Sequence, residues 1–257
     1  MTLIDALVIG SGPSGCAATA ALVRAGIRPT VIDGGLRSVP SSTHIELGSK
    51  AEPGRKAWLG STAAYQQPQP PLVEYHDRLL ARVSYAHGGF SRVWGATAEL
   101  PADWADWPED SRPRPSDLDE FQELLPRATT AWSRDLDSDA TSIPGSGASE
   151  RVMHRVMDAC DENWLVRRST VAIQTAPRAA NKCRPCARCL EGCPRHSIWF
   201  AGDSIDAWAA ADRIDYSPGL TVLDMSEKAD AVEVRFRLAG GSEDRLLARR
   251  VFVGAGP

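Results

Sequence analysis

The sequence predicts an α/β fold in which strands from both ends of the chain contribute to one sheet. Within residues 5–33, a strand-like apolar run, a glycine-rich turn, an alanine-rich segment and a second apolar run follow one another, which is the order of a β-α-β unit. Residues 220–254 hold three strand-like segments separated by turns, as in a β-meander. The composition, with 43% hydrophobic and 24% charged residues, is that of a globular chain that can bury a core.

The β-α-β unit is expected to begin with DALVIG at residues 5–10, a nearly continuous apolar run typical of buried parallel strands. The alanine-rich residues 16–25 are expected to form a helix that ends at Gly26, because glycine is common just past a helix C-terminus. A second strand, PTVID, is expected to end at Asp33.

The turn between strand and helix has the pattern Gly10-x-Gly12-x-x-Gly15. The first glycine permits a tight turn, the second lets the backbone approach a pyrophosphate, and the third lets the helix lie close to the strand. The amides that open the helix then face the phosphates, and a carboxylate after the second strand can accept hydrogen bonds from ribose hydroxyls. A glycine-rich turn without a function is the alternative, but the flanking elements favour a dinucleotide site. The expected cofactor-binding residues here are Gly10, Gly12, Pro13, Ser14, Gly15 and Asp33.

The middle of the chain gives weaker signals. Two adjacent glycines in 87-HGGFSRVWGATAELP-101 indicate a tight turn or a close approach of the backbone to a ligand. Ser116 is expected to cap a helix over residues 117–128, and another helix is expected at about residues 150–160. The polar residues 133–149 are expected to form a surface loop.

Three strands are expected near the C-terminus, at residues 220–225, 231–238 and 246–254. The glycine motif alone does not distinguish FAD from NAD. Its start at residue 10 favours FAD, and so does the last strand, because in two-dinucleotide-fold flavoproteins such a strand follows a β-meander and returns to the FAD sheet. The expected fold is therefore an FAD-binding Rossmann-like domain with a β-meander and a cysteine-rich insertion.

Four of the six cysteines lie within eleven residues, in the order Cys183-x2-Cys186-x2-Cys189-x3-Cys193-Pro194. This is the spacing of bacterial ferredoxins, and its short gaps place successive thiolates around one small iron–sulfur cluster. The alternatives are zinc, which more often pairs two CxxC knuckles across a longer loop, and redox or structural thiols. Either Cys193 closes a [4Fe–4S] cluster, or the other three cysteines hold a [3Fe–4S] cluster.

Arginines interleave with these cysteines at Arg184, Arg188 and Arg195. Their charge either raises the potential of a cluster or docks an acidic electron carrier, or it is simply solvated. Cys16 lies outside the run, on the first expected helix, and is expected to be buried.

Three sets of motifs together resemble the glucose-methanol-choline (GMC) family of FAD-dependent oxidoreductases: DALVIGSGPSGCAAT with VIDGG, GGFSRVWGA with the following ADWP, and ARRVFVGAG. The resemblance spans the chain in order, with loose matches between the motifs. It implies hydride transfer to FAD from the CH–OH group of a small-molecule alcohol or sugar donor. It also implies that the second glycine motif passes along the flavin. The residues expected near the isoalloxazine ring are Gly88, Gly89, Ser91 and Gly95.

The form GG-x-S-x-x-W of this second motif is similar to the sugar-oxidising branches of the family. Some relatives bind FAD covalently through a histidine at the position of Val93, so non-covalent FAD is expected here, and His87, displaced from that position, is expected to pack. Some sugar dehydrogenases of the family carry a cysteine-rich insertion with an iron–sulfur cluster. The resemblance thus implies that electrons leave the flavin through a cluster toward an external electron acceptor.

The family's catalytic histidine lies in a C-terminal half that is expected to be missing from these 257 residues, so no catalytic residue is assigned. The leading interpretation is the N-terminal portion of an FAD-dependent oxidoreductase that is not active as this chain alone. The alternatives are an electron-transfer module or split-enzyme subunit that needs a second chain to complete the fold, and an inactive fragment.

Charge and hydropathy exclude several partners. The formal net charge of −4 argues against a nucleic-acid or acidic membrane surface, and no run of about 18 apolar residues is present to span a membrane. The N-terminus carries no basic leader or cleavage site, so a cytoplasmic location is expected. The expected organisation is the first part of the FAD-binding domain at 1–100, a mostly helical insertion at 101–180, a cysteine-rich cluster-binding segment at 181–200 and the second part of the FAD-binding domain at 201–257.

Overall fold

The structure is a computed structural model, and the chain forms two compact units. The first comprises Met1–Trp94, Leu190–Pro194 and Phe200–Pro257, and the second comprises Gly95–Cys189 and Arg195–Trp199. The residues that the structure describes are 3–35, 72–74, 80–82, 84–97, 108–110, 112, 114, 147–161, 164, 166, 171–175, 179–186, 189, 193 and 195–256. The segment boundaries expected from the sequence stay a prediction.

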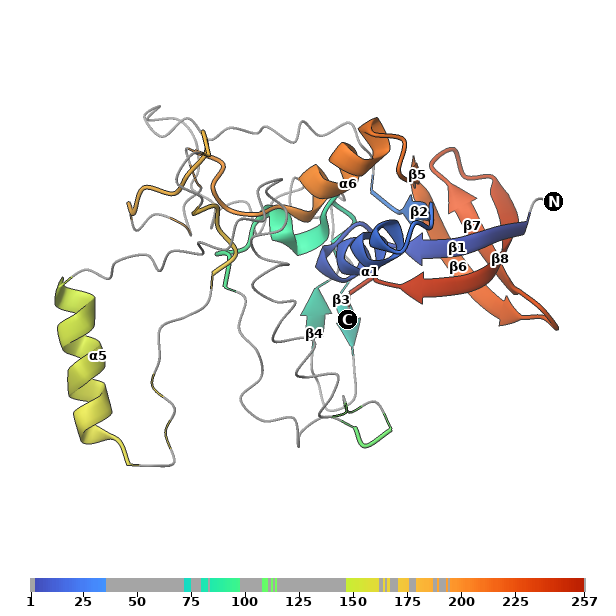
Figure 1. Cartoon of the computed structure of the whole chain (residues 1–257). Coiled ribbons are helices and arrows are strands. Elements are labelled where there is room, and N and C mark those ends of the chain that lie inside the picture. Colours follow the sequence, from blue (N-terminus) through green and yellow to red (C-terminus); the bar gives the residue numbers. More distant parts are fainter. Residues whose placement is uncertain are drawn as a thin grey trace. The chain divides into compact units, whose positions relative to one another are not determined.

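A six-stranded mixed sheet forms the centre of the first unit, in the order β5-β2-β1-β8-β7-β6 (Figure 1). Its strands are β1 (Leu3–Ile9), β2 (Thr30–Asp33), β5 (Asp215–Pro218), β6 (Leu220–Glu227), β7 (Val232–Leu238) and β8 (Glu243–Val253). Strands β5, β2, β1 and β8 are parallel, whereas β8, β7 and β6 form an antiparallel meander. The expectation that the last strand returns to the first β-α-β unit is confirmed, because β8 pairs in parallel with β1.

Burial explains why β1 reads as a continuous apolar run. Ala6, Leu7, Val8 and Ile9 are all buried, so both faces of this strand are covered, as expected for a strand in the middle of a sheet. On one face, Leu7 and Ile9 join a core cluster with Ile32, Val234 and Ala248. Strands from both ends of the sequence thus share one core, and each fully buried aliphatic side chain stabilises it by roughly 1.5–3 kcal/mol.

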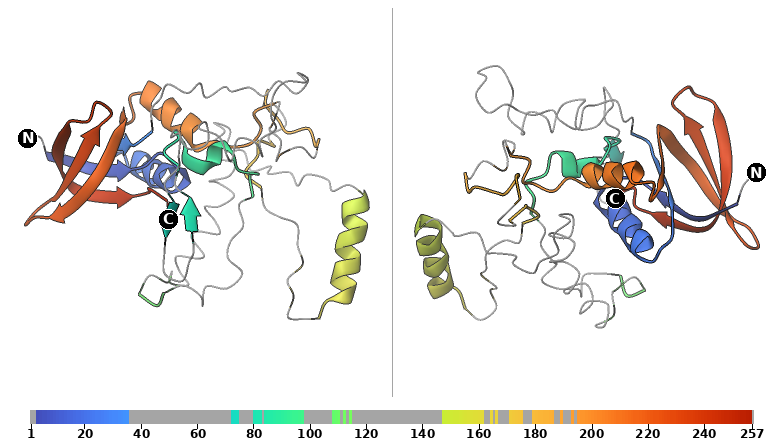
Figure 2. Two further views of the ribbon diagram at one scale, coloured as in Figure 1. Left: turned by 180° about the vertical axis from the view of Figure 1, so that it is seen from behind. Right: turned by 45° about the horizontal axis from the view of Figure 1, so that its top comes forward.

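Two helices of this unit lie side by side, α1 (Pro13–Arg24) and α6 (Ala201–Ala210) (Figures 1 and 2). Helix α1 has Pro13 in its first turn, where proline loses no helical hydrogen bond, and it is followed by Gly26 with φ +77°. The expected β-α-β unit is therefore confirmed. Helix α6 packs against α1 and β5, and the sequence interpretation identified neither α6 nor β5.

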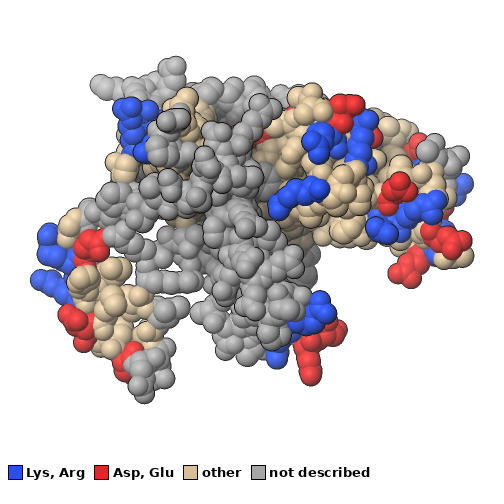
Figure 3. Space-filling model, in the orientation of Figure 1, with Lys and Arg blue, Asp and Glu red and all other residues tan. Residues whose placement is uncertain are grey.

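The meander carries cross-strand ion pairs between side chains that are exposed or half-buried. Arg237 pairs with Glu243 at 2.9 Å, Arg245 pairs with Glu233 at 3.5 Å, and Arg235 pairs with Asp224. Acids and bases accordingly alternate over this end of the sheet (Figure 3). Surface pairs of this kind add little stability, but a charged side chain such as Asp224 on the edge strand β6 discourages pairing with another sheet.

The same unit holds a small antiparallel pair, β3 (Leu72–Glu74) with β4 (Leu80–Arg82), and a 3-10 turn, η2 (Gly89–Arg92). The second unit contains α5 (Gly147–Ala159), which begins before the expected residue 150, so the last three residues of the expected surface loop are helical. The helix expected at 117–128 and the rest of that loop lie outside the described residues. In the part of the chain that the structure describes, no helix combines the length and apolar character needed to cross a membrane.

Candidate dinucleotide-binding site

Three glycines allow the end of β1, the start of α1 and the end of β8 to meet. Gly10 has φ +98°, and a Cβ atom there would lie 2.6 Å from the carbonyl oxygen of Gly254. A Cβ on Gly15 would overlap the carbonyl oxygen of Gly10, and a Cβ on Gly254 would overlap the backbone of Gly15. The tight turn expected at Gly10 and the close helix–strand packing expected at Gly15 are therefore confirmed.

Gly12 differs from these three. Its φ of −65° is open to any residue, and the atom nearest to an added Cβ would be Gly89 Cα at 4.0 Å. Packing within the protein therefore does not require glycine at this position. The missing side chain instead leaves room in front of α1, where the first turn carries no acidic residue and Gly12, at the N-cap, has no side chain to cap the helix amides. A helix N-terminus of this kind favours an anion.

Asp33, the last residue of β2, is buried, with 7% of the residue exposed. Its Oδ2 accepts a hydrogen bond from the backbone N–H of Ser11, and its Oδ1 accepts one from the N–H of Gly35, both at 2.9 Å. Burial raises the pKa of this carboxyl, while the hydrogen bonds from Ser11 and Gly35 and the nearby His87 oppose the rise. A carboxylate offers about four acceptor sites, so Asp33 retains capacity for further donors such as ribose hydroxyls.

The second glycine motif lies against the first. Gly88 donates its N–H to Ser11 Oγ at 2.8 Å, and an added Cβ on Gly89 would lie 3.3 Å from Gly12 Cα. Gly88 and Gly89 have φ values of +79° and +57°, which favour glycine. The Gly88–Gly89 turn and the loop from Gly10 to Gly15 thus form two adjoining walls.

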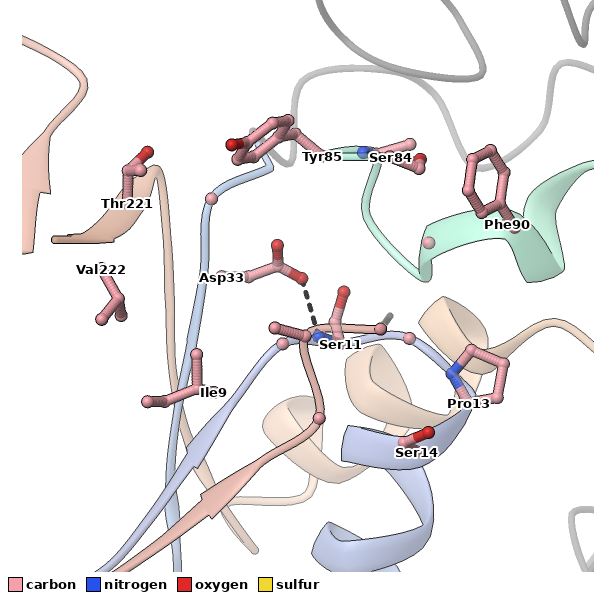
Figure 4. A pocket seen from close by; sticks show the side chains of 18 of the residues that line it. Ile9, Ser11, Pro13, Ser14, Asp33, Ser84, Tyr85, Phe90, Thr221 and Val222 are labelled. Atoms are coloured by element: carbon pink, nitrogen blue, oxygen red, sulfur yellow. Dashed lines mark hydrogen bonds between the residues drawn. The ribbon is translucent and has the colours of Figure 1, made fainter. Parts of the chain in front are cut away.

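A cavity of about 430 Å³ opens where these elements meet, within the roughly 300–1,000 Å³ typical of ligand pockets (Figure 4). Figure 4 shows Asp33 and Ser11 between Thr221 and Val222 on one side and Pro13 and Phe90 on the other. The lining residues come from the glycine-rich loop, Asp33-Gly34, Ser84–Ala86, Gly89-Phe90, Leu220–Val222 and Gly254–Gly256. The cavity is thus lined largely by glycine-rich backbone and contains one buried carboxylate. This combination fits a dinucleotide.

The residues expected to bind the cofactor occupy different places. Those that line the cavity are Gly10, Gly12, Pro13, Ser14, Asp33 and Gly89. Gly15 and Gly88 support the walls through packing and through the bond to Ser11, and Ser91 is buried behind them at 2% exposure. Gly95 belongs to the second unit. Contact of these residues with a cofactor stays a prediction.

Several lining residues were missed by the sequence interpretation. Thr221 and Val222 lie at the start of β6, and Tyr85 and Phe90 flank the second glycine motif. The Gly254-Ala255-Gly256 turn carried a usable signal, because glycines directly after a buried strand indicate a close approach of the backbone. Tyr85 and Thr221 carried none, since an isolated aromatic or β-branched residue fits many environments.

The cysteines fall into two environments. Cys16 is fully buried on α1, as expected, and burial raises the pKa of its thiol far above the ordinary value. In the run, Cys186 is exposed and Cys183, Cys189 and Cys193 are half-buried. The described residues include all four cysteines of the run, yet among them no group of three or more His, Cys, Asp or Glu side chains is placed to hold a metal ion.

Hydrogen bonds of side chains and backbone in the second unit hold the segments on either side of the cysteine run together. Asn181 Nδ2 donates to the carbonyl of His196 at 3.0 Å, and Ser197 Oγ donates to the carbonyl of Asn181 at 2.6 Å. Cys183 N–H donates to the carbonyl of Gln174 at 2.8 Å, and Gln174 N–H donates to the carbonyl of Ser197 at 2.7 Å. The segments before and after the run are thus tied at their base.

No family model and no curated protein matches the chain, so the resemblance to the GMC family stays a prediction. Among solved structures, the chain is similar to a flavoprotein/dehydrogenase from Cytophaga hutchinsonii, with 12% identity and a TM-score of 0.37. The match covers 99% of this chain and 40% of that protein. The chain is similar over 98% of its length to 39% of the bacillithiol disulfide reductase Bdr (YpdA) from Bacillus cereus, with 10% identity and a TM-score of 0.34. It also covers 42% of the p-nitrophenol 4-monooxygenase PnpA from Pseudomonas putida DLL-E4, over 100% of its own length, with 12% identity and a TM-score of 0.36. The chain spans less than half the length of each of these proteins.

Proposed function

We propose that this chain binds FAD non-covalently and forms the dinucleotide-binding part of an oxidoreductase. The observation that carries the proposal is the cavity of about 430 Å³ that is bounded by the Gly10–Gly15 loop and the Asp33 carboxylate. In it, the first turn of α1 would bind the pyrophosphate through backbone amides, and Asp33 would accept hydrogen bonds from the adenosine ribose. The absence of a side chain at Gly12 leaves the space that the phosphates need.

FAD is favoured over NAD by the path of the chain around this cavity. The meander delivers Thr221 and Val222 to one wall, and β8 returns beside β1 to place Gly254 next to the glycine-rich loop. This connection, in which a β-meander completes the nucleotide sheet, is the one expected for a two-dinucleotide-fold flavoprotein. The apolar and glycine-rich walls would exclude water from the adenosine half of the cofactor.

The reaction proposed for the complete protein is oxidation of a CH–OH group in an alcohol or sugar. Bound FAD would supply the acceptor for a hydride. The residues of this chain would bind and orient the dinucleotide, with Gly88, Gly89, Ser91 and Gly95 supporting the flavin end. No residue described here is assigned as the base that removes the alcohol proton.

We further propose that Cys183, Cys186, Cys189 and Cys193 hold an iron–sulfur cluster that passes electrons to an external acceptor. The ferredoxin-like spacing supports this assignment, and so does the tied base of the run, because it keeps the two ends of a cluster-binding loop close together. Arg184 and Arg195 are exposed beside the cysteines and would attract an acidic electron carrier. Zinc remains the alternative metal, because four thiolates also suit it.

The test is to purify the chain without oxygen, incubate it with FAD, iron and sulfide, and remove unbound material. The retained flavin is then measured from its visible spectrum, and iron, sulfide and zinc are measured by chemical analysis. One FAD retained per chain supports the dinucleotide proposal. Bound iron together with a similar amount of bound sulfide supports the cluster proposal. Retention of NAD in a parallel incubation, with no FAD retained, would contradict the first proposal, and zinc without sulfide would contradict the second.

A further inference from the structure

A buried histidine, His87, holds the Gly88–Gly89 turn in place on the side away from the cavity. His87 is 3% exposed, and its ring lies between strand β5 and helix α6. Nδ1 lies 2.8 Å from the hydroxyl of Tyr216, and Nε2 lies 3.2 Å from the carbonyl oxygen of Gly202 and 3.3 Å from Asp206 Oδ2. We call His87, Tyr216, Gly202 and Asp206 the His87 hub. These partners stand 115 to 129 residues farther along the chain, so the hub joins distant segments.

One tautomer of the ring satisfies every partner of the hub. A phenol hydroxyl is a good donor, so Tyr216 donates to Nδ1, and the proton on Nε2 is then shared between the Gly202 carbonyl and the Asp206 carboxylate. Each ring nitrogen therefore has a polar partner at hydrogen-bonding distance inside the protein. A buried side chain bonded in this way is fixed in its position and orientation.

The residues after the turn are fastened to the same helix. Ser91 Oγ donates to the carbonyl of Gly88 at 2.6 Å and accepts the N–H of Ala201, the first residue of α6, at 3.1 Å. The guanidinium of Arg92 lies 4.9 Å from the ring centroid of Phe200, and its Nη2 donates to the carbonyl of His87 at 3.4 Å. Burial lowers the pKa of Arg92, while the carboxylates of Asp203 and Asp206 oppose this shift.

Space around the turn leaves little freedom for it to move. A Cβ on Gly88 would overlap the ring of Phe200, and a Cβ on Gly202 would lie 2.8 Å from His87 Cδ2. On the other side of the turn, the Gly88 N–H is bonded to Ser11 Oγ, while Gly89 and Phe90 line the cavity. A displacement of His87 would therefore move the cavity wall that adjoins the glycine-rich loop.

From this geometry we infer that His87 is a positioning residue for the dinucleotide: through Tyr216 and Asp206 it fixes the Gly88–Gly89 turn against Ser11 and Gly12. The inference rests on the proposed function, because the positioned wall is the wall of the FAD site. It goes beyond packing, since it assigns the effect to the hydrogen bonds of the imidazole. Replacements of similar size with and without polar atoms should then behave differently.

The first experiment compares FAD affinity in three variants by titration. H87L, which removes both hydrogen-bonding nitrogens, is expected to weaken FAD binding by about tenfold, the effect of losing buried hydrogen bonds. H87Q keeps an acceptor and a donor and is expected to stay within about threefold of the native chain. The control is H154Q, because His154 is exposed on α5, and it should leave affinity unchanged. Native affinity in H87L, or equal weakening in H87L and H87Q, would overturn the inference.

The second experiment uses Tyr216→Phe, which removes a single oxygen and should fold even if H87L does not. Hydrogen exchange of the Gly88 amide is measured without any dinucleotide. In the native chain this amide is expected to exchange slowly, because it donates to Ser11 Oγ, and in Y216F it is expected to exchange about tenfold faster. Unchanged exchange in Y216F would overturn the inference. If the native chain exchanges as expected but binds no FAD, then the proposed function fails while the positioning of the turn stands.

Discussion

The glycine-rich loop and the cysteine run are both marked by short motifs with defined spacing, but the folded chain realises them differently. At Gly10, Gly15 and Gly254, three backbone segments approach so closely that no side chain fits, and Asp33 is bonded to two of the neighbouring amides. In the cysteine run, the ends are tied through Asn181 and Ser197, yet the described residues contain no group of side chains placed to hold a metal.

The difference follows from what builds each kind of site. A site made of backbone amides is formed by the packing of strands and helices, so burial of Leu7, Val8 and Ile32 forms it whether or not a ligand is bound. A thiolate site gains its order largely from the metal, because binding free energy brings the ligands together. The glycine-rich loop is thus expected to be present in the free chain, whereas the cysteine site is expected to form with its cluster.

The largest effect is expected from Gly15→Ala, which tests whether the loop is formed by packing. Alanine in an exposed helix would be favoured over glycine by roughly 0.5–1 kcal/mol, but here its Cβ would overlap the carbonyl oxygen of Gly10. We expect the free energy of unfolding to fall by about 3 kcal/mol, as measured by urea denaturation. A G15A chain as stable as the native one would contradict the packing described at this glycine.

Removal of one cysteine from the run tests the other side of the comparison. In chain reconstituted with iron and sulfide, Cys183→Ser is expected to abolish the bound cluster, because one of its thiolate ligands is lost. Cys160→Ser is the matched control, since Cys160 lies outside the run, and it should retain the iron content of the native chain.

FAD affinity should be the same in C183S and in the native chain, because the glycine-rich loop does not depend on the cysteines for its formation. Full retention of iron by C183S would show that the cysteine run does not hold the cluster. A large loss of FAD affinity in C183S would show that the two sites are not formed independently.

A smaller effect is expected from Gly12→Ala, which separates binding from folding. The nearest atom to the added Cβ would be Gly89 Cα at 4.0 Å, so the free energy of unfolding should change by no more than about 0.5 kcal/mol. The Cβ would occupy the cavity, so FAD affinity should fall about tenfold or more through overpacking of the bound pyrophosphate. FAD affinity and the free energy of unfolding are measured on the same preparation. An unchanged FAD affinity in G12A would show that the pyrophosphate does not bind next to Gly12.

The smallest effect is expected from pH. Because the pKa of Asp33 is raised, its carboxylate gains a proton at a higher pH than an ordinary Asp, and a protonated carboxyl is a poorer acceptor for ribose hydroxyls. FAD affinity should therefore fall about threefold or more as the pH is lowered through the raised pKa of Asp33, and Asp33→Asn should remove this dependence.

The raised pKa of Asp33 makes folding stability depend on pH in the opposite direction to FAD affinity. A raised pKa contributes stability that is complete below the ordinary Asp value of about 3.9 and is lost as the pH rises through the raised value. If FAD affinity instead rose as the pH fell, Asp33 would not act as the acceptor for the ribose.

The sequence predicted those parts of the fold whose residues carry a local signal. DALVIG specifies a strand through its apolar run, the glycine-rich turn through its spacing, and AVEVRFRL through its alternation, and the structure confirms them as β1, the start of α1 and β7. Helix α6 escaped prediction because AGDSIDAWAA includes Gly202, Ser204 and two aspartates, and it is stabilised by contacts with α1 and β5. Tertiary packing of this kind leaves little trace in a local pattern.

Part of the candidate site was predictable for the same reason. The residues of the glycine motif and Asp33 have defined spacing. Thr221 and Val222, by contrast, line the cavity only because the meander joins the sheet beside the first strands, and Tyr85 lines it from the segment before the Gly88–Gly89 turn. The His87 hub was equally hidden, since its partners lie more than a hundred residues away. His87 was expected only to pack, and its hydrogen bonds emerge from the tertiary structure.

The binding of FAD at the start of α1 is tested most directly by titrating the isotopically labelled chain with FAD and following its backbone amide resonances. We expect the largest shifts at Ser11, Gly12 and Ser14, which open α1, and smaller shifts at Gly89 and Thr221 across the cavity. If saturation with FAD left the amides at the start of α1 unchanged, the pyrophosphate would not bind there, wherever else in the chain the resonances moved.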